Sequence, residues 1–289
     1  MVLFPNCKIN LGLRVAARRD DGYHDLETIF YPLNLRDAAE IITYTARKEA
    51  EPFELTITGE SVPGDPQTNL CRKAWQLVKH DFPNIPPIRM YLHKAVPIGA
   101  GLGGGSADGA FTLRLLNDAL KLNISTDKLL SYALQLGSDC PFFILNKPVH
   151  ARGRGEIMEE VTVDLSDYYF VLIFPGIHVN TGEVFKELHE LRKSDRQDAA
   201  TGALPSLKQM ITLPVTSWRD TLTNDFELPV FKRFPEIKKI KDLLYDAGAA
   251  YASMTGTGSS VYGIFHKNKK TGNLKAAENY KVYILNKSH

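Results

Sequence analysis

The sequence predicts an α+β protein built from two domains. Its 289 residues suffice for two ordinary domains, and 44% hydrophobic with 24% charged residues is an average composition for a globular protein. Strand and helix patterns follow one another in mixed order, without the regular strand–helix alternation of a doubly wound parallel sheet. Residues 150–156 indicate a glycine-rich turn, and we place the domain boundary shortly after it, so that the domains span 1–158 and 159–289.

Alternation of apolar and polar residues predicts the strands of the first domain. Ile9, Leu11 and Leu13 recur at every second position in a segment that begins near the N-terminus. The segments predicted to be extended are 2–17, 26–35, 39–44, 53–58, 88–94 and 142–145. Apolar residues at helical spacing predict helices at 69–80, 106–120 and 128–136.

The second domain shows the same mixture of patterns. Its expected strands are 170–174 and 282–285, together with a strand and a second apolar segment on either side of a loop at 255–260. Its expected helices are 181–191, 235–247 and 275–280. Residues 193–216 are polar and poor in aromatic residues, which predicts a long mobile insertion.

Composition argues against several classes of partner. The formal net charge of +2 predicts neither a nucleic-acid-binding nor a membrane-binding surface. Cys7, Cys71 and Cys140 are widely spaced without a Cys-x-x-Cys pair, which argues against a zinc site or disulfide framework and favours the cytoplasm. No apolar run approaches the length of a membrane span, and the N-terminal residues lack a signal-peptide core. We therefore expect no nucleic acid and no membrane, and the sequence indicates no obligate protein partner.

The most informative stretch runs from Val96 to Ala110, where glycine fills five of the seven positions from Gly99 to Gly105. Ordering so many glycines costs backbone entropy, and in return they expose backbone N–H groups that can converge on an anion. The helix expected from Ser106 adds its positive N-terminal end, and Ser106 itself is placed to cap that helix. The pattern predicts a phosphate-binding loop, with a plain tight turn as the alternative. It lacks the Gly-Lys-Ser/Thr of a Walker A loop and the spacing of a dinucleotide fingerprint.

Three separated stretches carry a family resemblance. They are Pro5-Asn6-Cys7-Lys8-Ile9-Asn10-Leu11 with Gly22-Tyr23-His24, then residues 97–108, then Thr255-Gly256-Thr257-Gly258-Ser259-Ser260. In these stretches the chain resembles the GHMP kinase superfamily, which includes galactokinases and homoserine and mevalonate kinases. The turns at 19–24, 137–143 and 153–156 make it look most like the members whose substrate is a cytidine diphosphate small molecule.

This resemblance implies a fold, an activity and cofactors. The N-terminal domain would be like domain 2 of ribosomal protein S5 and the C-terminal domain ferredoxin-like, with the active site in the cleft between them. The implied activity is ATP-dependent phosphorylation of the 2-hydroxyl of a cytidine diphosphate methylerythritol, in the non-mevalonate route to isoprenoids. Mg²⁺ would bridge the phosphates of ATP.

The resemblance also implies residue roles. The positions that match ATP-binding residues are Pro97, Gly99, Ala100, Gly101, Leu102, Gly103, Gly104, Gly105 and Ser106 of the loop, with Asn69 and Leu70 on the adenine side. Asp139 matches the catalytic base, and Lys8 matches the cation beside it. The residues alone leave plainer alternatives open: Asp139 as a turn cap, Lys8 as a solvated strand lysine, and residues 69–70 as an ordinary helix start.

A cytosine ring suits aromatic stacking and hydrogen bonds to its polar edge. Tyr23 and Phe185 match the two stacking rings of the family, and His24 matches the histidine that bonds the edge. Asn10 and Thr181 match positions that contact the sugar-like part of the substrate. Because Phe185 lies on an amphipathic helix, a place in the core is the alternative for its ring. His93 and His178 are interpreted as structural.

Two competing functions stay open at this stage. One is another GHMP kinase, of the homoserine or mevalonate type, against which the Tyr23-His24 turn argues. The other is a non-catalytic nucleotide- or RNA-binding module, because the implied N-terminal fold also occurs in ribosomal proteins. The near-neutral charge argues against RNA, and the presence of both Lys8 and Asp139 argues against an inactive kinase.

Overall fold

The computed structural model describes residues 1–18, 24–44, 51–194, 205–274, 277 and 279–286. Its strands are β1 (Val2–Leu3), β2 (Asn6–Arg18), β3 (His24–Arg36), β4 (Ala38–Thr43), β5 (Phe53–Gly59), β6 (Ile88–Lys94), β7 (Val149–Gly153), β8 (Ile157–Glu160), β9 (Tyr168–Phe174), β10 (Tyr251–Met254), β11 (Val261–His266) and β12 (Lys281–Asn286). Its helices are η1 (Pro66–Thr68), α1 (Leu70–Asp81), α2 (Gly104–Leu120), α3 (Thr126–Leu136), α4 (Cys140–Leu145), α5 (Thr181–Ser194), α6 (Leu207–Met210), η3 (Val215–Asp220), α7 (Glu227–Arg233) and α8 (Pro235–Asp246). None of the helices so described is long and apolar enough to cross a membrane. The mixture confirms the predicted α+β class.

The chain forms two compact units that share its length in alternating segments. Unit 1 comprises 1–8, 35–98 and 103–147, and unit 2 comprises 9–34, 99–102 and 148–289. These units are defined by contacts, and the division at residue 158 expected from the sequence stays a prediction.

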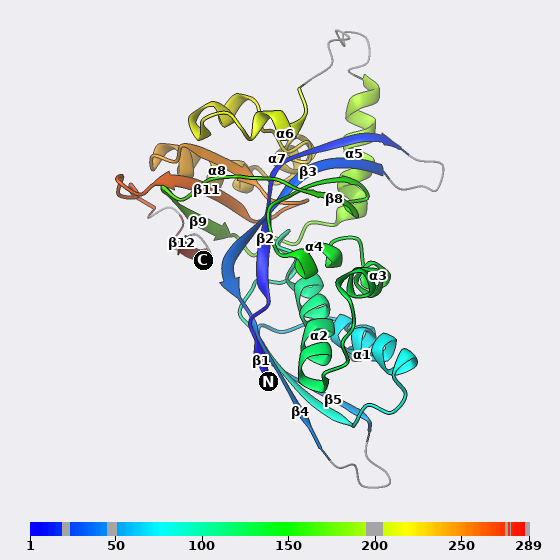
Figure 1. Ribbon diagram of the computed structural model, residues 1–289. Coiled ribbons are helices and arrows are strands. Elements are labelled where there is room, and N and C mark those ends of the chain that lie inside the picture. Colours follow the sequence, from blue (N-terminus) through cyan, green and yellow to red (C-terminus); the bar gives the residue numbers. More distant parts are fainter. Residues whose placement is uncertain (19–23, 45–50, 195–204, 275–276, 278, 287–289) are drawn as a thin grey trace. The chain divides into compact units, whose positions relative to one another are not determined.

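Unit 1 is a four-stranded sheet with helices on one side. The strand order is β1-β4-β6-β5, in which β6 pairs antiparallel with β4 and parallel with β5. Along β6, Ile88, Met90 and Leu92 are buried, while the side chains between them are exposed. This period-two pattern means that one face of the sheet is covered, and α1 and α2 lie over it (Figure 1).

Helices α1 and α3 of unit 1 begin at capping residues that the sequence provides. The Asn69 side chain accepts a hydrogen bond from the Cys71 amide at the start of α1, and Ser125 accepts one from the Lys128 amide in α3. Helix α2 departs from the expectation, because it begins at Gly104 behind an N-cap glycine and has no side-chain cap. Ser106, predicted as the cap, is the third residue of the helix instead.

Two sequence predictions around α4 are wrong. Residues 142–145, expected as a strand, form the last four of the six residues of this helix, which has Pro141 in its first turn and ends at a left-handed Asn146. A four-residue apolar run cannot by itself distinguish a buried strand from a buried helix. Residues 150–153, expected as part of a turn, lie in β7, which pairs with both β3 and β8.

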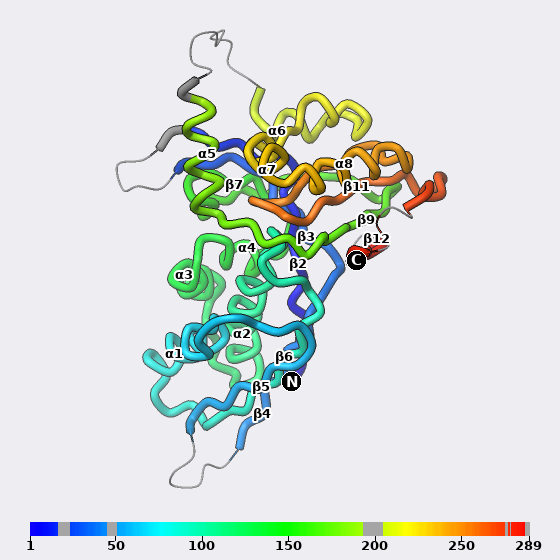
Figure 2. The backbone as a smooth tube through the Cα atoms, turned by 180° about the vertical axis from the view of Figure 1, so that it is seen from behind, coloured from blue at the N-terminus to red at the C-terminus, as the bar shows by residue number. Residues whose placement is uncertain are grey.

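Unit 2 contains two sheets. Strands β2, β3, β7 and β8 are neighbours in that order in one, and the other has the order β10-β11-β9-β12 with every pair antiparallel. The second sheet joins β9, α8, the β10–β11 hairpin and β12 in the manner of the expected ferredoxin-like arrangement. Seen from behind in Figure 2, α8 runs over β11 of this sheet.

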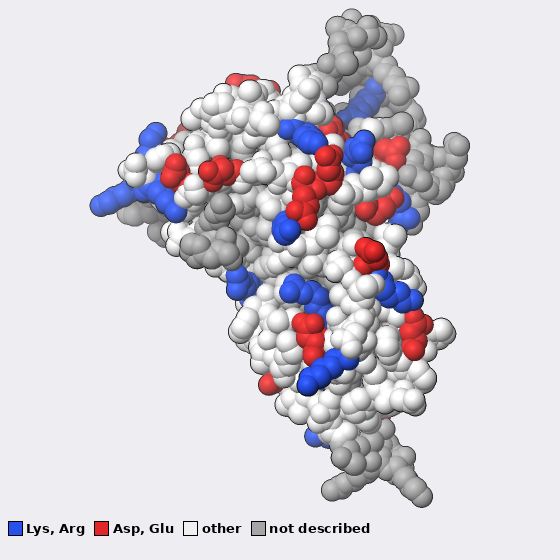
Figure 3. Space-filling model, in the orientation of Figure 1, with Lys and Arg blue, Asp and Glu red and all other residues white. Residues whose placement is uncertain are grey.

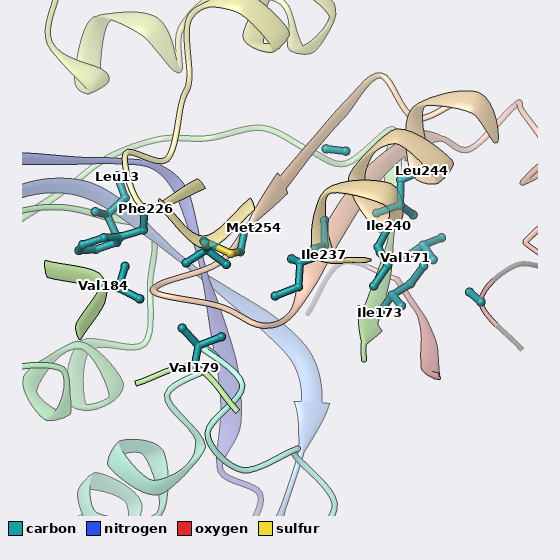
Figure 4. Close-up of a cluster of buried hydrophobic side chains, with 14 of the residues drawn as sticks. Leu13, Val171, Ile173, Val179, Val184, Phe226, Ile237, Ile240, Leu244 and Met254 are labelled. Carbon is teal, nitrogen blue, oxygen red and sulfur yellow. The ribbon is translucent and has the colours of Figure 1, made fainter. Parts of the chain in front are cut away.

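The core of unit 2 forms where α8 meets the sheet. Ile237, Ile240 and Leu244 recur at helical spacing, and all three pack in one buried cluster with Val171 and Ile173 of β9 (Figure 4). The cluster continues through Leu13, Val184, Phe226 and Met254, so strand β2 and helices α5 and α7 share the same core.

The stretch 193–216, predicted as a long mobile insertion, carries regular secondary structure where the structure describes it. Helix α5 continues to Ser194, α6 begins with a capping box between Ser206 and Gln209, and η3 begins at Val215. Leu207 is fully buried, and its side chain packs on Gly12 of β2. The described part thus packs on the β2 sheet. Residues 195–204, and residues 275, 276 and 278 of the helix expected at 275–280, lie outside the described residues.

Candidate active site

The glycine loop leads into α2 through a series of left-handed residues. Gly99, Gly101 and Gly103 have φ of 66°, 77° and 71°, which residues with a side chain rarely adopt. Gly103 is the N-cap of α2 and provides no side-chain acceptor. The first amides of the helix have no intrahelical partner, so this N-terminus, with its helix dipole, is suited to an anion.

Within unit 1, Lys8 and Asp139 meet beside this helix start. The Lys8 Nζ lies 3.5 Å from Asp139 Oδ2. Lys8 is buried, at 4% exposure, whereas the Asp139 side chain is 34% exposed. Such burial excludes the alternative of a solvated lysine. Asp139 occupies the N-cap position of α4 but makes no side-chain cap hydrogen bond, so the turn-cap alternative is not observed either.

The stem of Lys8 packs against the end of the glycine loop. A Cβ placed on Gly103 would lie 3.2 Å from Lys8 Cγ and 3.0 Å from Phe143 Cζ. Any side chain at position 103 would therefore push on the lysine that faces Asp139. Next to Asp139, Cys140 is a protonated thiol, because burial raises its pKa to about 12, against a hydrogen bond from Ser106 that lowers it.

A buried ion cluster beneath the same helix start was missed by the sequence analysis. Lys94 Nζ contacts a carboxylate oxygen of Asp37 and lies 2.6 Å from Asp108 Oδ2 in α2. All three residues are less than 5% exposed. Burial raises the pKa of Asp108 to about 8, although Lys94 acts in the opposite direction. The signal was present in β6, whose alternation puts Lys94 on the same face as the buried Leu92.

In unit 2, the middle of the glycine loop packs on the loop 255–260. Thr255 Oγ1 donates to the carbonyl of Gly101 at 3.2 Å, and the Ser260 amide donates to that of Ala100 at 3.3 Å. A Cβ on Gly101 would lie 2.1 Å from the Thr255 carbonyl oxygen, so glycine is required there. The second glycine-rich stretch thus supports the first by direct contact.

Two buried asparagines hold the 255–260 loop. Asn10 Oδ1 accepts from Thr255 Oγ1 at 3.1 Å and from the Gly256 amide at 3.0 Å. Asn224 donates from Nδ2 to the carbonyls of Met254 and Gly256, both at 2.8 Å. From the sequence, Asn10 is predicted to contact the substrate, whereas no role is predicted for Asn224. Asn224 stands in the short polar stretch Thr223-Asn224-Asp225, and such a stretch is too common to identify a residue of this kind.

The proposed cytosine-binding residues are partly brought together. The rings of His24 and Phe185 stack with centroids 4.7 Å apart and planes 22° apart. Phe185 also meets Phe226 edge to face and is half-buried, so one side of its ring belongs to the core. Tyr23 lies outside the described residues. At the start of α5, the hydroxyls of Thr181 and Thr257 are 3.0 Å apart.

The remaining predicted positions have clear local roles. Asn69 caps α1, and Leu70 packs under α2, where a Cβ on Gly109 would lie 2.9 Å from its Cβ. His93 pairs with Thr58 at 3.0 Å. His178, interpreted as structural, is exposed, and its Nδ1 lies 3.6 Å from where a Cβ on Gly99 would be.

Comparison with known proteins identifies the family. Models of the N-terminal domain and of the C-terminal region of GHMP kinases match residues 69–147 and 189–282. A 4-diphosphocytidyl-2-C-methyl-D-erythritol kinase of Bacteroides fragilis is 46% identical over 270 residues, which cover 93% of this chain and 94% of the relative. The chain belongs to the GHMP kinase family. Within it, the chain belongs with the 4-diphosphocytidyl-2-C-methyl-D-erythritol kinases, as the sequence resemblance suggested.

Other relatives agree with this assignment. A protein of the same name from Parabacteroides distasonis is 47% identical over 269 residues, covering 92% of both chains. A crystal structure of 4-(cytidine 5'-diphospho)-2C-methyl-D-erythritol kinase superposes with a TM-score of 0.77 at 27% identity, covering 99% of both chains. The mevalonate kinase of Methanococcus jannaschii, at TM-score 0.72, 14% identity and coverage of 100% and 98%, shares the fold. This GHMP kinase is therefore an ATP-using small-molecule kinase.

Proposed function

We propose that this GHMP kinase transfers the γ-phosphoryl group of ATP to the 2-hydroxyl of 4-diphosphocytidyl-2-C-methyl-D-erythritol, in the cytoplasm, as a step of the non-mevalonate route to isoprenoids. The observation that carries the chemistry is the pairing of buried Lys8 with Asp139 beside the start of α2. The substrate is supported by relatives of that name at 45% identity and above.

The loop 97–106 would hold the phosphates of ATP. It combines three left-handed glycines with a helix start that has no side-chain cap, which leaves backbone amides available to phosphate oxygens. Asn69 and Leu70 would lie on the adenine side. The Asn69 side chain caps α1 and the Leu70 side chain packs under α2, but the backbone atoms of both residues could still contact the adenine.

Asp139 would act as the proton acceptor. As the substrate oxygen forms its bond to the γ-phosphorus, the bond from that phosphorus to the bridging oxygen of ADP breaks, and the hydroxyl proton passes to an Asp139 carboxylate oxygen. The Lys8 ammonium, 3.5 Å from that carboxylate, would stabilise negative charge on the attacking oxygen. Its burial makes this charge effect larger than it would be in water.

The donor set near α2 fits Mg²⁺ that is held chiefly by ATP. Within the described residues, no group of three or more His, Cys, Asp and Glu side chains could hold a metal ion. Mg²⁺ in kinases takes most of its oxygens from phosphates and water, with one or two from the protein. Ser106 and Asp139 would offer those protein oxygens. When bound, the ion neutralises charge on the transferred phosphoryl group.

The cytidine end of the substrate would be recognised in unit 2. His24 would bond the polar edge of cytosine, and the rings of Tyr23 and Phe185 would stack on its faces. The His24–Phe185 stack already places two of these rings together. Thr181 and Asn10 would contact the sugar-like part, and Asn10 would also shape the 255–260 loop.

Release of ADP by the purified protein tests this proposal. The assay compares 4-diphosphocytidyl-2-C-methyl-D-erythritol with homoserine and mevalonate, each with MgATP. We expect turnover with the cytidine compound and background rates with the other two alcohols. Turnover with another alcohol instead would keep the Lys8–Asp139 chemistry and reject the substrate assignment. ATP binding without turnover of any acceptor would favour a nucleotide-binding module.

A further inference from the structure

The buried cluster of Asp37, Lys94 and Asp108 has no part in the chemistry above, yet it touches both ends of the glycine loop. Asp37 Oδ1 accepts hydrogen bonds from the amides of Ala95 at 2.6 Å and Val96 at 2.8 Å. These are the two residues that follow β6 and enter the loop. A carboxylate that receives two backbone amides holds that peptide in one conformation.

The second contact of the cluster is with the helix that leaves the loop. Lys94 bridges from Asp37 to Asp108 Oδ2 in the second turn of α2. The first turn is close as well, because a Cβ on Gly104 would lie 3.5 Å from Lys94 Nζ and 3.1 Å from Val96 Cγ1. All of these residues belong to unit 1. One ionic cluster therefore joins the peptide before the loop to the helix after it.

The burial of this cluster needs an explanation beyond stability. A buried ion pair seldom stabilises a fold more than apolar residues of the same volume would. Here an ammonium faces the carboxyl groups of Asp37 and Asp108 at exposures below 5%, and Asp108 Oδ1 has no hydrogen-bond partner among the described residues. A carboxylate can hold backbone amides in a fixed geometry by accepting their hydrogen bonds, which an apolar group cannot do.

We propose that Asp37 is a positioning residue for ATP: its carboxylate fixes the 95–96 peptide and, through Lys94, the start of α2, so that the phosphate-binding amides are in place before ATP arrives. The inference rests on the proposed function of the loop as the phosphate site. Asp37 acts through the backbone and Lys94, and it is not a catalytic residue. The benefit is that binding does not have to order the loop.

The first test compares Asp37→Asn with the parent enzyme. The change keeps the size of the side chain but places an amide group where a carboxylate meets Lys94. We expect the KM for ATP to rise at least about tenfold. The Kd for the β,γ-imido analogue of MgATP, measured by calorimetry, should rise by at least about the same factor. The KM for the cytidine substrate should change less than about twofold, which corresponds to a negligible change in binding.

Leu116→Ala is the matched control, because Leu116 is fully buried in the second half of α2 and lies outside the cluster. It should destabilise unit 1 without changing analogue binding. Equal losses of analogue affinity in both variants would show that Asp37 is merely structural and would overturn the inference. Unchanged affinity in Asp37→Asn would overturn it too. Failure of the parent enzyme to bind the analogue would instead reject the proposed function of the loop.

A measurement on the unaltered protein covers the case in which Asp37→Asn does not fold. Hydrogen exchange of the Ala95 and Val96 amides reports whether they are bonded before nucleotide binds. We expect strong protection of both amides in the nucleotide-free enzyme, with little change on adding MgATP analogue. Fast exchange in the free enzyme that slows only with nucleotide would contradict preorganisation by Asp37.

Discussion

The ammonium of Lys8 lies 3.5 Å from the carboxylate of Asp139, and the same lysine stem packs against Gly103 at the end of the glycine loop. A proton acceptor, a buried positive charge and a helix start suited to phosphate are thus adjacent within unit 1. Because each supplies a different need of phosphoryl transfer, each can be removed separately and its effect measured.

Replacing Asp139 by Asn should lower kcat by about 10²–10⁴, the usual range for loss of a general base, with little change in the KM for ATP. The side chain is a third exposed and makes no cap hydrogen bond, so folding should be retained. The measurement is steady-state ADP release, with circular dichroism as the check on folding. Near-normal turnover by a folded Asp139→Asn enzyme would reject the role of base.

Replacing Lys8 by Met should also lower kcat, by about 10²–10³, because it removes charge stabilisation of the attacking oxygen and keeps the apolar stem. The double variant with Asp139→Asn should be much less impaired than the product of the two single effects. Residues that act as a unit are strongly non-additive in their kinetics. Fully multiplicative effects would mean that the two groups act in separate steps.

Replacing His24 by Ala should raise the KM for the cytidine substrate by roughly five- to hundredfold, the range expected for loss of one base-stacking or edge contact. The KM for ATP should stay within about twofold, a change too small to signify lost binding energy. His266→Ala is the matched control, because His266 also makes an aromatic pair in unit 2, with Tyr168 at 5.3 Å. Equal changes in both KM values for His24→Ala would contradict a role in cytidine recognition.

Adding a methyl group at Gly101 should abolish nucleotide binding. The new Cβ would lie 2.1 Å from the Thr255 carbonyl oxygen, and φ is 77°. Gly64→Ala is the control, since Gly64 has φ of 100° with nothing within 4 Å of its Cβ position. Both changes incur the cost of a left-handed alanine, about 1–2 kcal/mol. Binding of MgATP analogue by calorimetry should be lost in Gly101→Ala alone.

The free energy of unfolding should depend on pH through the titration of Asp108. Its pKa is raised by burial from an ordinary value of 3.8 to about 8, so between these pH values the native state holds a proton that the unfolded chain releases. The free energy of unfolding should therefore fall as pH rises through this window, by up to about 1.4 kcal/mol per pH unit.

Asp108→Asn removes this titration. Urea unfolding from pH 4 to 8 should show that the stability of the parent protein, relative to Asp108→Asn, declines steadily with pH. Asp118→Asn, an exposed change on the same helix, should leave the pH profile of the parent protein unaltered. Parallel profiles for the parent protein and Asp108→Asn would show that Asp108 is not protonated in the native state.

The sequence predicted elements well where one pattern persisted over many residues. The alternation in 53–58 and 88–94 and the helical spacing in α8 gave elements close to β5, β6 and α8. It failed at 142–145, where the apolar run is too short for a period to appear. Helix α6 and the start of η3, which fall within 193–216, were not predicted because the burial of Leu207 depends on a distant surface, that of Gly12 in β2.

The site was predictable only through residues that match a known family. Nothing local in Lys8 or Asp139 indicates that the two side chains meet, since their approach depends on the whole of unit 1. Lys94 shows what a local pattern could have added. Its place on the buried face of β6 follows from the same alternation that predicted the strand, and a buried lysine requires an anionic partner, here Asp37.

Each of the two units is built from segments that are far apart in the sequence, and this affects folding during synthesis. Asn10 bonds to Thr255, which lies 245 residues further along the chain and is therefore synthesised much later. The Gly256 amide, 246 residues further along, bonds to the same asparagine. The middle of the glycine loop, at 99–102, belongs to the same late-completed unit. Contacts between residues so far apart in the sequence form slowly during folding. A nascent chain that stops short of the 255–260 loop cannot complete its glycine loop, so truncated products should be inactive and open to proteolysis.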